Sequence, residues 1–188
     1  FLFGRTGWET LDMLLIISGA FGMFRKSAII SVGGFRTDTV GEDMDLIVRL
    51  HRYMREQKKK YRIAFLSEPV CWTEAPESTQ ILARQRNRWQ RGLMESVLYN
   101  KKMLFNPKYG RIGLVALPFT LFVEGFGPLV EVFGSIFILI SFIVGYLDYQ
   151  FALAFLMVAF LLGIISSMSA IIIEELTYKR YPRLKDIL

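Results

Sequence analysis

Two residue types that often build functional sites are scarce in this chain of 188 residues. Cys71 is the only cysteine, so a disulfide framework is excluded, and nothing near it argues for an activated thiol. His51 is the only histidine, so no metal cluster can be built around it; we expect a surface or packing residue. Aromatic residues, by contrast, make up 14% of the sequence, and a chain so rich in large apolar side chains is not disordered.

Residues 112–173 contain no lysine or arginine, although the chain has 23 basic and 17 acidic residues. The hydrophobic fraction of 53% is high for a soluble domain, and this segment holds the excess. Residues 151–173 form an uninterrupted apolar stretch, long enough at about 1.5 Å per residue to cross a hydrocarbon core of roughly 30 Å. Residues 129–147 are a second candidate span, and residues 146–150, with interfacial tyrosines, would form the turn.

Residues 112–127 are less regular, because Pro118 and Glu124 break or polarise a membrane span. We favour an interfacial or re-entrant helix there; a kinked extension of the first span is the alternative. The chain thus divides into a soluble part (1–111), a membrane region (112–173) and a basic tail (174–188).

Basic residues flank the membrane region on both sides. They are Lys101, Lys102, Lys108 and Arg111 before it, and Lys179, Arg180, Arg183 and Lys185 after it. The positive-inside rule places both flanks in the cytoplasm, so the number of crossings is even and two spans suffice. A basic face against anionic membrane lipids explains the net charge of +6, and no motif for nucleic-acid binding is present.

The soluble part alternates apolar patterns of strand and helix type, which predicts an α/β fold. We expect strands over 17–25, 62–66 and 70–72. We expect a hydrophobic helix or a surface segment over 1–17. We expect further helices from an N-cap at Ser27 to Gly33, over 42–56, and from an N-cap at Ser78 to about residue 104.

The sequence Gly41-Glu42-Asp43-Met44-Asp45 stands at a predicted helix start. Carboxylates in a first helical turn commonly serve only to stabilise the helix, through their favourable interaction with its dipole. The functional alternative is a general base at a loop-to-helix junction that faces a cleft. A metal-binding Asp-x-Asp pair is disfavoured, because residues two apart on a helix diverge by roughly 200°.

The predicted long helix presents Gln85, Arg88, Trp89 and Gly92 on one face, at positions i, i+3, i+4 and i+7. An arginine suits a diphosphate, an indole suits the apolar face of a sugar, and the glycine would leave room for a ligand. A basic, aromatic helix lying at a membrane surface explains the same pattern. A third candidate is Gly19, in the small-residue run 18–22, where a substrate or another backbone could approach closely.

The order of these motifs is more informative than any one of them. A small-residue strand, Gly-Glu-Asp at a helix start, Thr-Glu-Ala-Pro at 73–76, Gln-x-x-Arg-Trp and then membrane helices together resemble the C-terminal part of a membrane-bound family 2 glycosyltransferase. The similarity is to the processive type, such as cellulose, hyaluronan and poly-N-acetylglucosamine synthases, and covers essentially the whole chain. It implies a GT-A-like, Rossmann-like catalytic domain followed by transmembrane helices.

The resemblance also implies roles for individual residues. Asp43 matches the general base of the family's Thr-Glu-Asp motif, Glu42 is its neighbour, and Gly41 replaces the usual threonine, a departure we expect to be tolerated. Gln85, Arg88 and Trp89 match the motif that lines the acceptor and diphosphate end of the site. Gly19 matches, more loosely, an acceptor-contacting strand.

The reaction implied is inverting transfer from a nucleotide sugar, expected to be a UDP-sugar, to a saccharide or lipid-linked acceptor. The family's Mg²⁺ or Mn²⁺ would be held by an Asp-x-Asp motif, which we expect upstream of Phe1. The chain begins with Phe1 rather than Met, so we expect a fragment that is inactive alone. The intact enzyme would be a multi-pass protein of the plasma (inner) membrane with its catalytic part in the cytoplasm.

Two other functions fit the same sequence. One is a glycosyltransferase that adds a single sugar to a lipid acceptor. The other is a non-catalytic membrane subunit whose basic helix holds anionic lipid.

Overall fold

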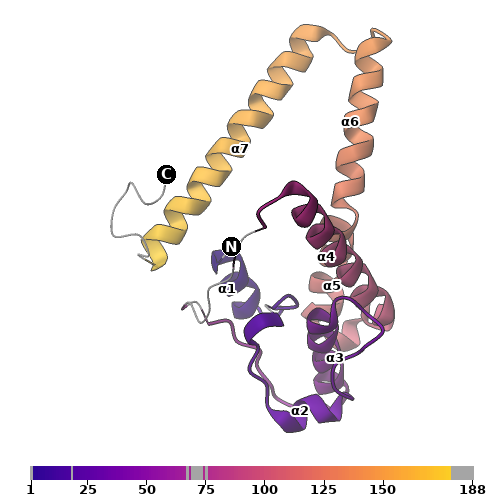
Figure 1. The fold of residues 1–188 in the computed structure, drawn as a ribbon, viewed down its shortest axis with the longest axis vertical. Helices are drawn as coiled ribbons and strands as arrows, with labels where there is room; N and C mark the ends of the chain where they lie inside the picture. The colour runs from indigo at the N-terminus through magenta and orange to yellow at the C-terminus, as the bar shows by residue number, and fades with distance from the viewer. Residues whose placement is uncertain (1, 18, 67, 69–73, 75, 179–188) are drawn as a thin grey trace. The chain divides into compact units, whose positions relative to one another are not determined.

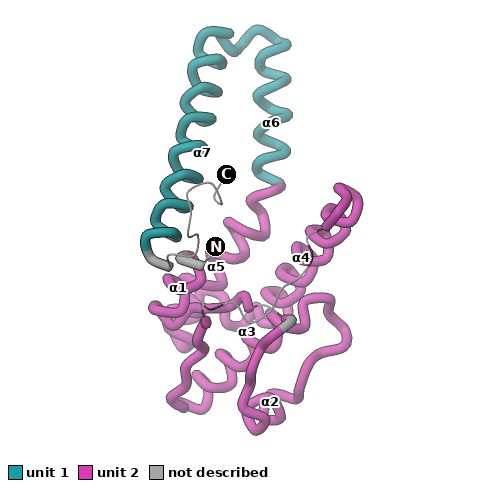
Figure 2. Tube along the Cα trace, turned by 60° about the vertical axis from the view of Figure 1, so that its left-hand side comes forward, with its two compact units in different colours: residues 1–3, 129–188 teal, residues 4–128 magenta. Residues whose placement is uncertain are grey.

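The computed structural model describes residues 2–17, 19–66, 68, 74 and 76–178, and the chain forms two compact units. Residues 4–128 make up the larger unit, and residues 1–3 with 129–188 make up the smaller one (Figure 2). The larger unit contains α1 (Leu2–Thr10, which begins in the smaller unit), α2 (Lys26–Ser31), α3 (Glu42–Glu56) and α4 (Thr79–Tyr99) (Figure 1). Short helical turns follow at η2 (Lys101–Met103) and η3 (Pro107–Tyr109).

Helix α3 is the centre of the larger unit, and every residue from Met44 to His51 is buried. On one side, Met44 and Val48 pack in a cluster with α4 and the chain beyond it. On the other side, Leu46, Ile47 and Leu50 form a second cluster that covers α2. Each fully buried aliphatic side chain contributes about 2 kcal/mol, so burial on both sides fixes α3 and, with it, the residues at its start.

The predicted helix over 42–56 is confirmed at both ends, and its charges explain its boundaries. Glu42, Asp43 and Asp45 lie in the first turn and Arg55 in the last, which is the favourable arrangement for the helix dipole. The N-cap at Ser78 is also confirmed, because its side chain accepts a hydrogen bond from the backbone N–H of Ile81 (3.3 Å).

Other predicted boundaries were wrong. The helix predicted over 1–17 ends at Thr10, because Asp12 takes a left-handed backbone conformation (φ 55°). The helix expected from Ser27 begins at Lys26 with Arg25 as its N-cap residue. The long helix ends at Tyr99 rather than 104.

The α/β prediction is not confirmed, since the described residues contain no β-strand. A turn, η1 (Gly19–Phe21), occupies the middle of 17–25, and 62–66 forms neither a helix nor a strand. Residues 70–72 lie outside the described residues. A strand exists only where a neighbouring strand satisfies its backbone hydrogen-bonding groups. In the non-helical chain after α1, a side chain does so: the carbonyl oxygen of Leu14 accepts from the ring of His51 (3.0 Å).

Residues 112–125 form a helical segment with wide turns: η4 (Ile112–Ala116), α5 (Leu117–Phe119) and η5 (Thr120–Gly125). One side of this segment is buried in the cluster that contains Met44 and Val48. The other side exposes large apolar residues, namely Leu114, Val115, Phe119, Phe122 and Val123. The segment therefore has one face in the core of the larger unit and one exposed apolar face.

The smaller unit contains two apolar helices joined by a turn, α6 (Gly127–Ile143, whose first two residues belong to the larger unit) and α7 (Tyr149–Tyr178) (Figure 1). By length and composition, the stretches Ile112–Ile143 and Tyr149–Ile173 could each cross a membrane. The first includes the segment 112–125, whose buried face belongs to the larger unit.

His51 lies buried in the core, as a packing residue. Its Nε2–H donates to the carbonyl of Leu14 (3.0 Å), which leaves Nδ1 to accept from the Tyr61 hydroxyl (2.6 Å). Burial is the main reason that the pKa of His51 falls to about 4, although the Leu14 carbonyl opposes the shift. The bond at Nδ1 requires the neutral ring, whereas the bond to Leu14 persists when the ring is charged, so a proton on His51 breaks the bond to Tyr61 and places a charge in the core.

This buried histidine predicts a pH-dependent stability. The unfolded chain takes up a proton near pH 6.5 and the folded chain only near pH 4, so stability present above pH 6.5 is lost as the pH falls towards 4. The loss from this residue should reach up to about 3 kcal/mol. Chemical unfolding at pH 7 and pH 5 measures it. An equal loss in a His51→Gln variant would assign the pH dependence to other groups.

Candidate active site

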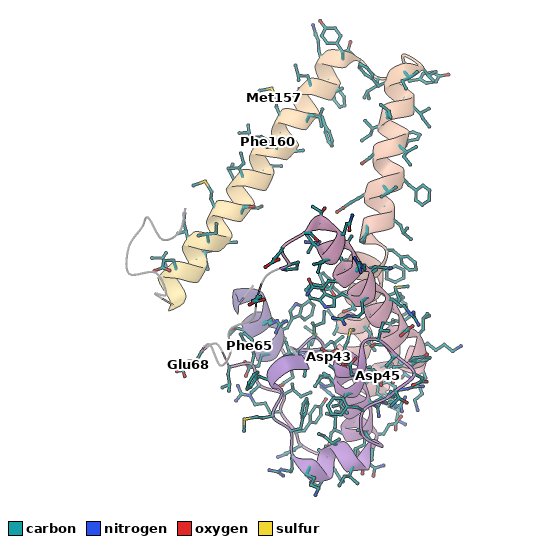
Figure 3. All side chains as sticks on the ribbon, in the orientation of Figure 1. Asp43, Asp45, Phe65, Glu68, Met157 and Phe160 are labelled. Atoms are coloured by element: carbon teal, nitrogen blue, oxygen red, sulfur yellow. The ribbon has the colours of Figure 1, made fainter. Side chains whose placement is uncertain are left out.

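Asp43 and Gly19, two of the predicted site residues, lie side by side. Asp43 is half-buried in the first turn of α3, where its Oδ1 accepts from the backbone N–H of Met44 (2.8 Å) (Figure 3). Gly19 belongs to the turn η1, and a methyl group added there would lie 3.0 Å from Asp43 Oδ2. The absence of a side chain at Gly19 thus leaves one edge of this carboxylate open.

A cation that the sequence did not single out accompanies Asp43. Arg5 comes from α1, and its guanidinium lies 5.7 Å from the centre of the Phe65 ring. Partial burial lowers the pKa of Arg5, and the negative charge of Asp43 works against that lowering. No sequence motif marks Arg5, because its position depends on how α1 folds back toward α3.

Asp45 has a different environment from Asp43, although only Met44 separates them (Figure 3). It is fully buried, and its Oδ2 accepts from Arg49 Nε (2.7 Å) while its Oδ1 accepts from Asn100 Nδ2 (3.2 Å). Arg49 also donates to the carbonyls of Val32 and Gly34. Asp45 therefore fastens α3 to its surroundings and takes no part in a carboxylate pair.

The residues present do not fit a metal ion. Asp43 and Asp45 diverge as their helical spacing predicted, and within the described ranges no three acidic, histidine or cysteine side chains gather closely enough to hold one. The divalent cation implied by the family resemblance has no donor set in this part of the chain.

Helix α4 meets the start of α3 through two glycines. A methyl group added to Gly41 would lie 2.7 Å from the Cα of Gly92, and one added to Gly92 would lie 2.7 Å from the Cα of Gly41. The expectation that Gly92 leaves room for a ligand is therefore wrong, because the backbone of Gly41 fills that space. The Gly41 that replaces the family's threonine is part of this close helix contact.

Side chains of α4 hold the loop before α3 in place. Glu95 Oε2 accepts from the Thr39 hydroxyl (2.8 Å) and from the backbone N–H of Val40 (3.2 Å). The buried Ser96 donates to the carbonyl of Gly92 (2.7 Å). The two bonds of Glu95 thus fix the loop before α3 against α4, whereas the bond of Ser96 to Gly92 lies within α4.

Gln85, Arg88 and Trp89 all lie on α4, within two turns before Gly92. Gln85 is half-buried, whereas Arg88 and Trp89 are exposed, Trp89 with 60% of its surface accessible. These residues share the face of α4 that carries Gly92, and helical side chains lean toward the N-terminus of their helix. They therefore lie beyond the Gly41–Gly92 contact, on the side where α3 begins. Glu42, also exposed, lies at that same start of α3.

Asp43 thus lies directly beside Gly19. Its relation to Gln85, Arg88 and Trp89 is indirect, because it depends on the contact between Gly41 at the start of α3 and Gly92 of α4. Among the described residues, no hydrogen bond or ion pair links Asp43 to that trio. Thr73 and Ala75 of the predicted Thr-Glu-Ala-Pro loop lie outside the described residues.

Sequence reasoning missed Gln90, which follows Trp89. Its Nε2 donates to the carbonyls of Glu124 (3.0 Å) and Gly125 (2.7 Å). Helix α4 is thereby tied to the segment 112–125 directly beside the exposed trio. A polar residue between Trp89 and the basic Arg91 gave no periodic signal that could have identified this link.

Proteins of similar sequence indicate what such a site does. The model of the glycosyl transferase family group 2 matches residues 4–166. A poly-beta-1,6-N-acetyl-D-glucosamine synthase of Staphylococcus aureus is 38% identical over 82 residues, which are 44% of this chain and 18% of that protein. The protein of the same description from Staphylococcus epidermidis is 37% identical over the same lengths.

The chain spans about a fifth of the length of these relatives, and no solved structure matches it. The family match, however, covers both the Gly-Glu-Asp helix start and the Gln-x-x-Arg-Trp face, together with α6 and most of α7. This chain belongs to glycosyl transferase family group 2.

Proposed function

We propose that this chain supplies the acceptor end of the active site of a polysaccharide synthase at a membrane. The observation that carries the proposal is the contact between Gly41 and Gly92, which sets the start of α3 against the face of α4 that bears Gln85, Arg88 and Trp89. Similarity to proteins described as poly-N-acetylglucosamine synthases favours polymer formation over a single addition.

Asp43 is the general base in this proposal. Its open carboxylate edge beside Gly19 would accept the proton of an acceptor hydroxyl. The hydroxyl oxygen then forms a bond to the anomeric carbon of the donor sugar from the side opposite the leaving group. The bond from that carbon to the diphosphate oxygen breaks with its electron pair, so the configuration inverts and a nucleoside diphosphate leaves.

The residues of α4 would bind and orient. Arg88, exposed and free to present its fork of N–H donors, suits the diphosphate of a UDP-sugar. Trp89 would stack on the acceptor sugar, and Gln85 and Glu42 would hydrogen-bond its hydroxyl groups. Mg²⁺ or Mn²⁺ would need ligands from outside these residues, and no step above depends on it.

The larger unit would be the C-terminal part of a GT-A-like domain on the cytoplasmic side of the plasma membrane. The exposed apolar face of 112–125 and the two apolar helices of 112–173 would anchor it there. A saccharide or lipid-linked acceptor and anionic lipids are its expected partners.

Replacing Trp89 by alanine tests whether the exposed face of α4 binds acceptor. In the full-length protein, Trp89→Ala should raise the KM for acceptor about tenfold, with a smaller change in kcat. Leu98→Ala is the matched control, because Leu98 is an exposed apolar residue (55%) on the opposite side of α4. If both variants change the KM equally, or if neither changes it, the exposed face of α4 does not bind acceptor and α4 is a membrane-surface helix.

A further inference from the structure

A cavity of about 490 Å³ lies at the end of α3 remote from Asp43. Arg55, which lines it, is twelve residues beyond Asp43, about 18 Å along the helix axis. The cavity is therefore separate from the proposed sugar-transfer site, and its size is in the range of small-ligand pockets.

The rim of this cavity is strongly basic. Arg55 and the three consecutive lysines Lys58, Lys59 and Lys60 line it, and among the described residues Asp12 is the only carboxylate that does so. The ammonium group of Lys59 also lies 5.2 Å from the centre of the Tyr53 ring. Glu56, the nearest other acid in sequence, is engaged elsewhere, because its Oε1 pairs with Lys102 (3.1 Å) and accepts from the Tyr109 hydroxyl (2.8 Å).

The floor of the cavity is neutral and already hydrogen-bonded. His51 and Tyr61 bond to each other, and the Tyr61 hydroxyl also accepts from Arg55 Nε (3.2 Å). Apolar side chains, those of Leu14, Met54 and Ile63, complete the wall. Asp12, whose charge acts on both His51 and Tyr61, is one anion against the four cations of the lining, so an excess of positive charge remains.

The three lysines are held at the rim by an unusual backbone turn. Lys58 has φ 51°, a left-handed conformation in which a helix end ordinarily has glycine. The turn is closed by two backbone bonds, from the N–H of Lys58 to the carbonyl of Arg55 (3.2 Å) and from that of Lys59 to the carbonyl of Met54 (2.9 Å). A solvated lysine run needs neither this turn nor a cavity beneath it.

We propose that this cavity binds an anion that carries phosphate groups. Several ammonium groups and one guanidinium around a hollow with a neutral floor provide the donors and the charge that a phosphate or diphosphate requires. The phosphate can belong to a soluble phosphoester or to the headgroup of an anionic lipid. The proposal is independent of the sugar-transfer function, because none of the lining residues belongs to that site.

Titration with inorganic pyrophosphate tests the proposal. The full-length protein in phosphatidylcholine nanodiscs should bind pyrophosphate with saturation. A Lys58→Gln/Lys60→Gln double variant should bind it about tenfold or more weakly. Arg25→Gln/Lys26→Gln is the matched control, since it removes two exposed positive charges near α2 and should leave the affinity unchanged.

Two further measurements complete the test. Lys58→Gly removes one cation while relieving the left-handed backbone, so the affinity should fall although the unfolding temperature holds or rises. Weaker binding of pyrophosphate in phosphatidylglycerol nanodiscs would identify a lipid headgroup as the occupant, and unchanged binding a soluble phosphoester. Absence of saturable binding, or equal losses in the two double variants, would overturn the proposal.

Discussion

Asp43→Asn in the full-length protein should lower kcat for sugar transfer by about 10²–10⁴-fold, the usual contribution of a general base. Asparagine keeps the shape of the side chain beside Gly19 but cannot take up a proton at neutral pH. Asp43 is half-buried, and its carboxylate accepts from the neighbouring backbone N–H of Met44, so the fold should depend little on its charge. Incorporation of radiolabelled sugar into product measures the effect.

Binding of the nucleotide sugar is the control for this variant. The donor should bind the Asp43→Asn protein nearly as tightly as the wild type, because the base acts on the acceptor hydroxyl. Sugar transfer at the wild-type rate would refute the assignment of Asp43 as the base. A parallel loss of donor affinity would place Asp43 in a binding role instead.

Asp45→Asn, two residues away, should instead lower the free energy of unfolding by about 3 kcal/mol. The substitution removes the charge that compensates Arg49, which is only 8% exposed in its side chain and is held by the carbonyls of Val32 and Gly34. A buried guanidinium without its carboxylate is strongly unfavourable. Chemical unfolding of the chain in detergent measures the change.

Asp38→Asn provides the matched comparison. Asp38 also pairs with an arginine, Arg36 (2.7 Å), but both side chains are open to water, so the substitution should change stability little. Similar effects at Asp38 and Asp45 would contradict the structural role given to the buried pair. If the results are as expected, Asp43→Asn lowers activity and Asp45→Asn lowers stability, although the two residues lie in the same helical turn.

The sequence predicted well the features that depend on local chemistry. The amphipathic and charge pattern of 42–56 and the serine cap at Ser78 define two helices that the structure contains. Asp43 and Gly19 were selected from a motif order, and the structure brings them together. The long stretch without cations likewise identified the region that holds the two apolar helices.

Features that depend on tertiary contacts could not be predicted. An apolar run such as 62–66 becomes a strand only if another strand lies beside it, and residue types alone do not reveal that neighbour. Gly92 has the same residue type whether it faces a ligand or the backbone of Gly41. The links made by Gln90 and Arg5 depend on segments that meet only when the chain folds.

An Arg88→Lys variant distinguishes a sugar-transfer face on α4 from a helix that only carries charge for lipid binding. Lysine keeps the charge but lacks the planar fork of donors that a diphosphate needs. Arg86→Lys is the control, because Arg86 is an exposed arginine about 100° around the helix from Gln85. Sugar transfer by the full-length protein should fall at least about tenfold for Arg88→Lys and remain unchanged for Arg86→Lys. Full activity of both variants would contradict the account and leave α4 as a basic membrane-surface helix.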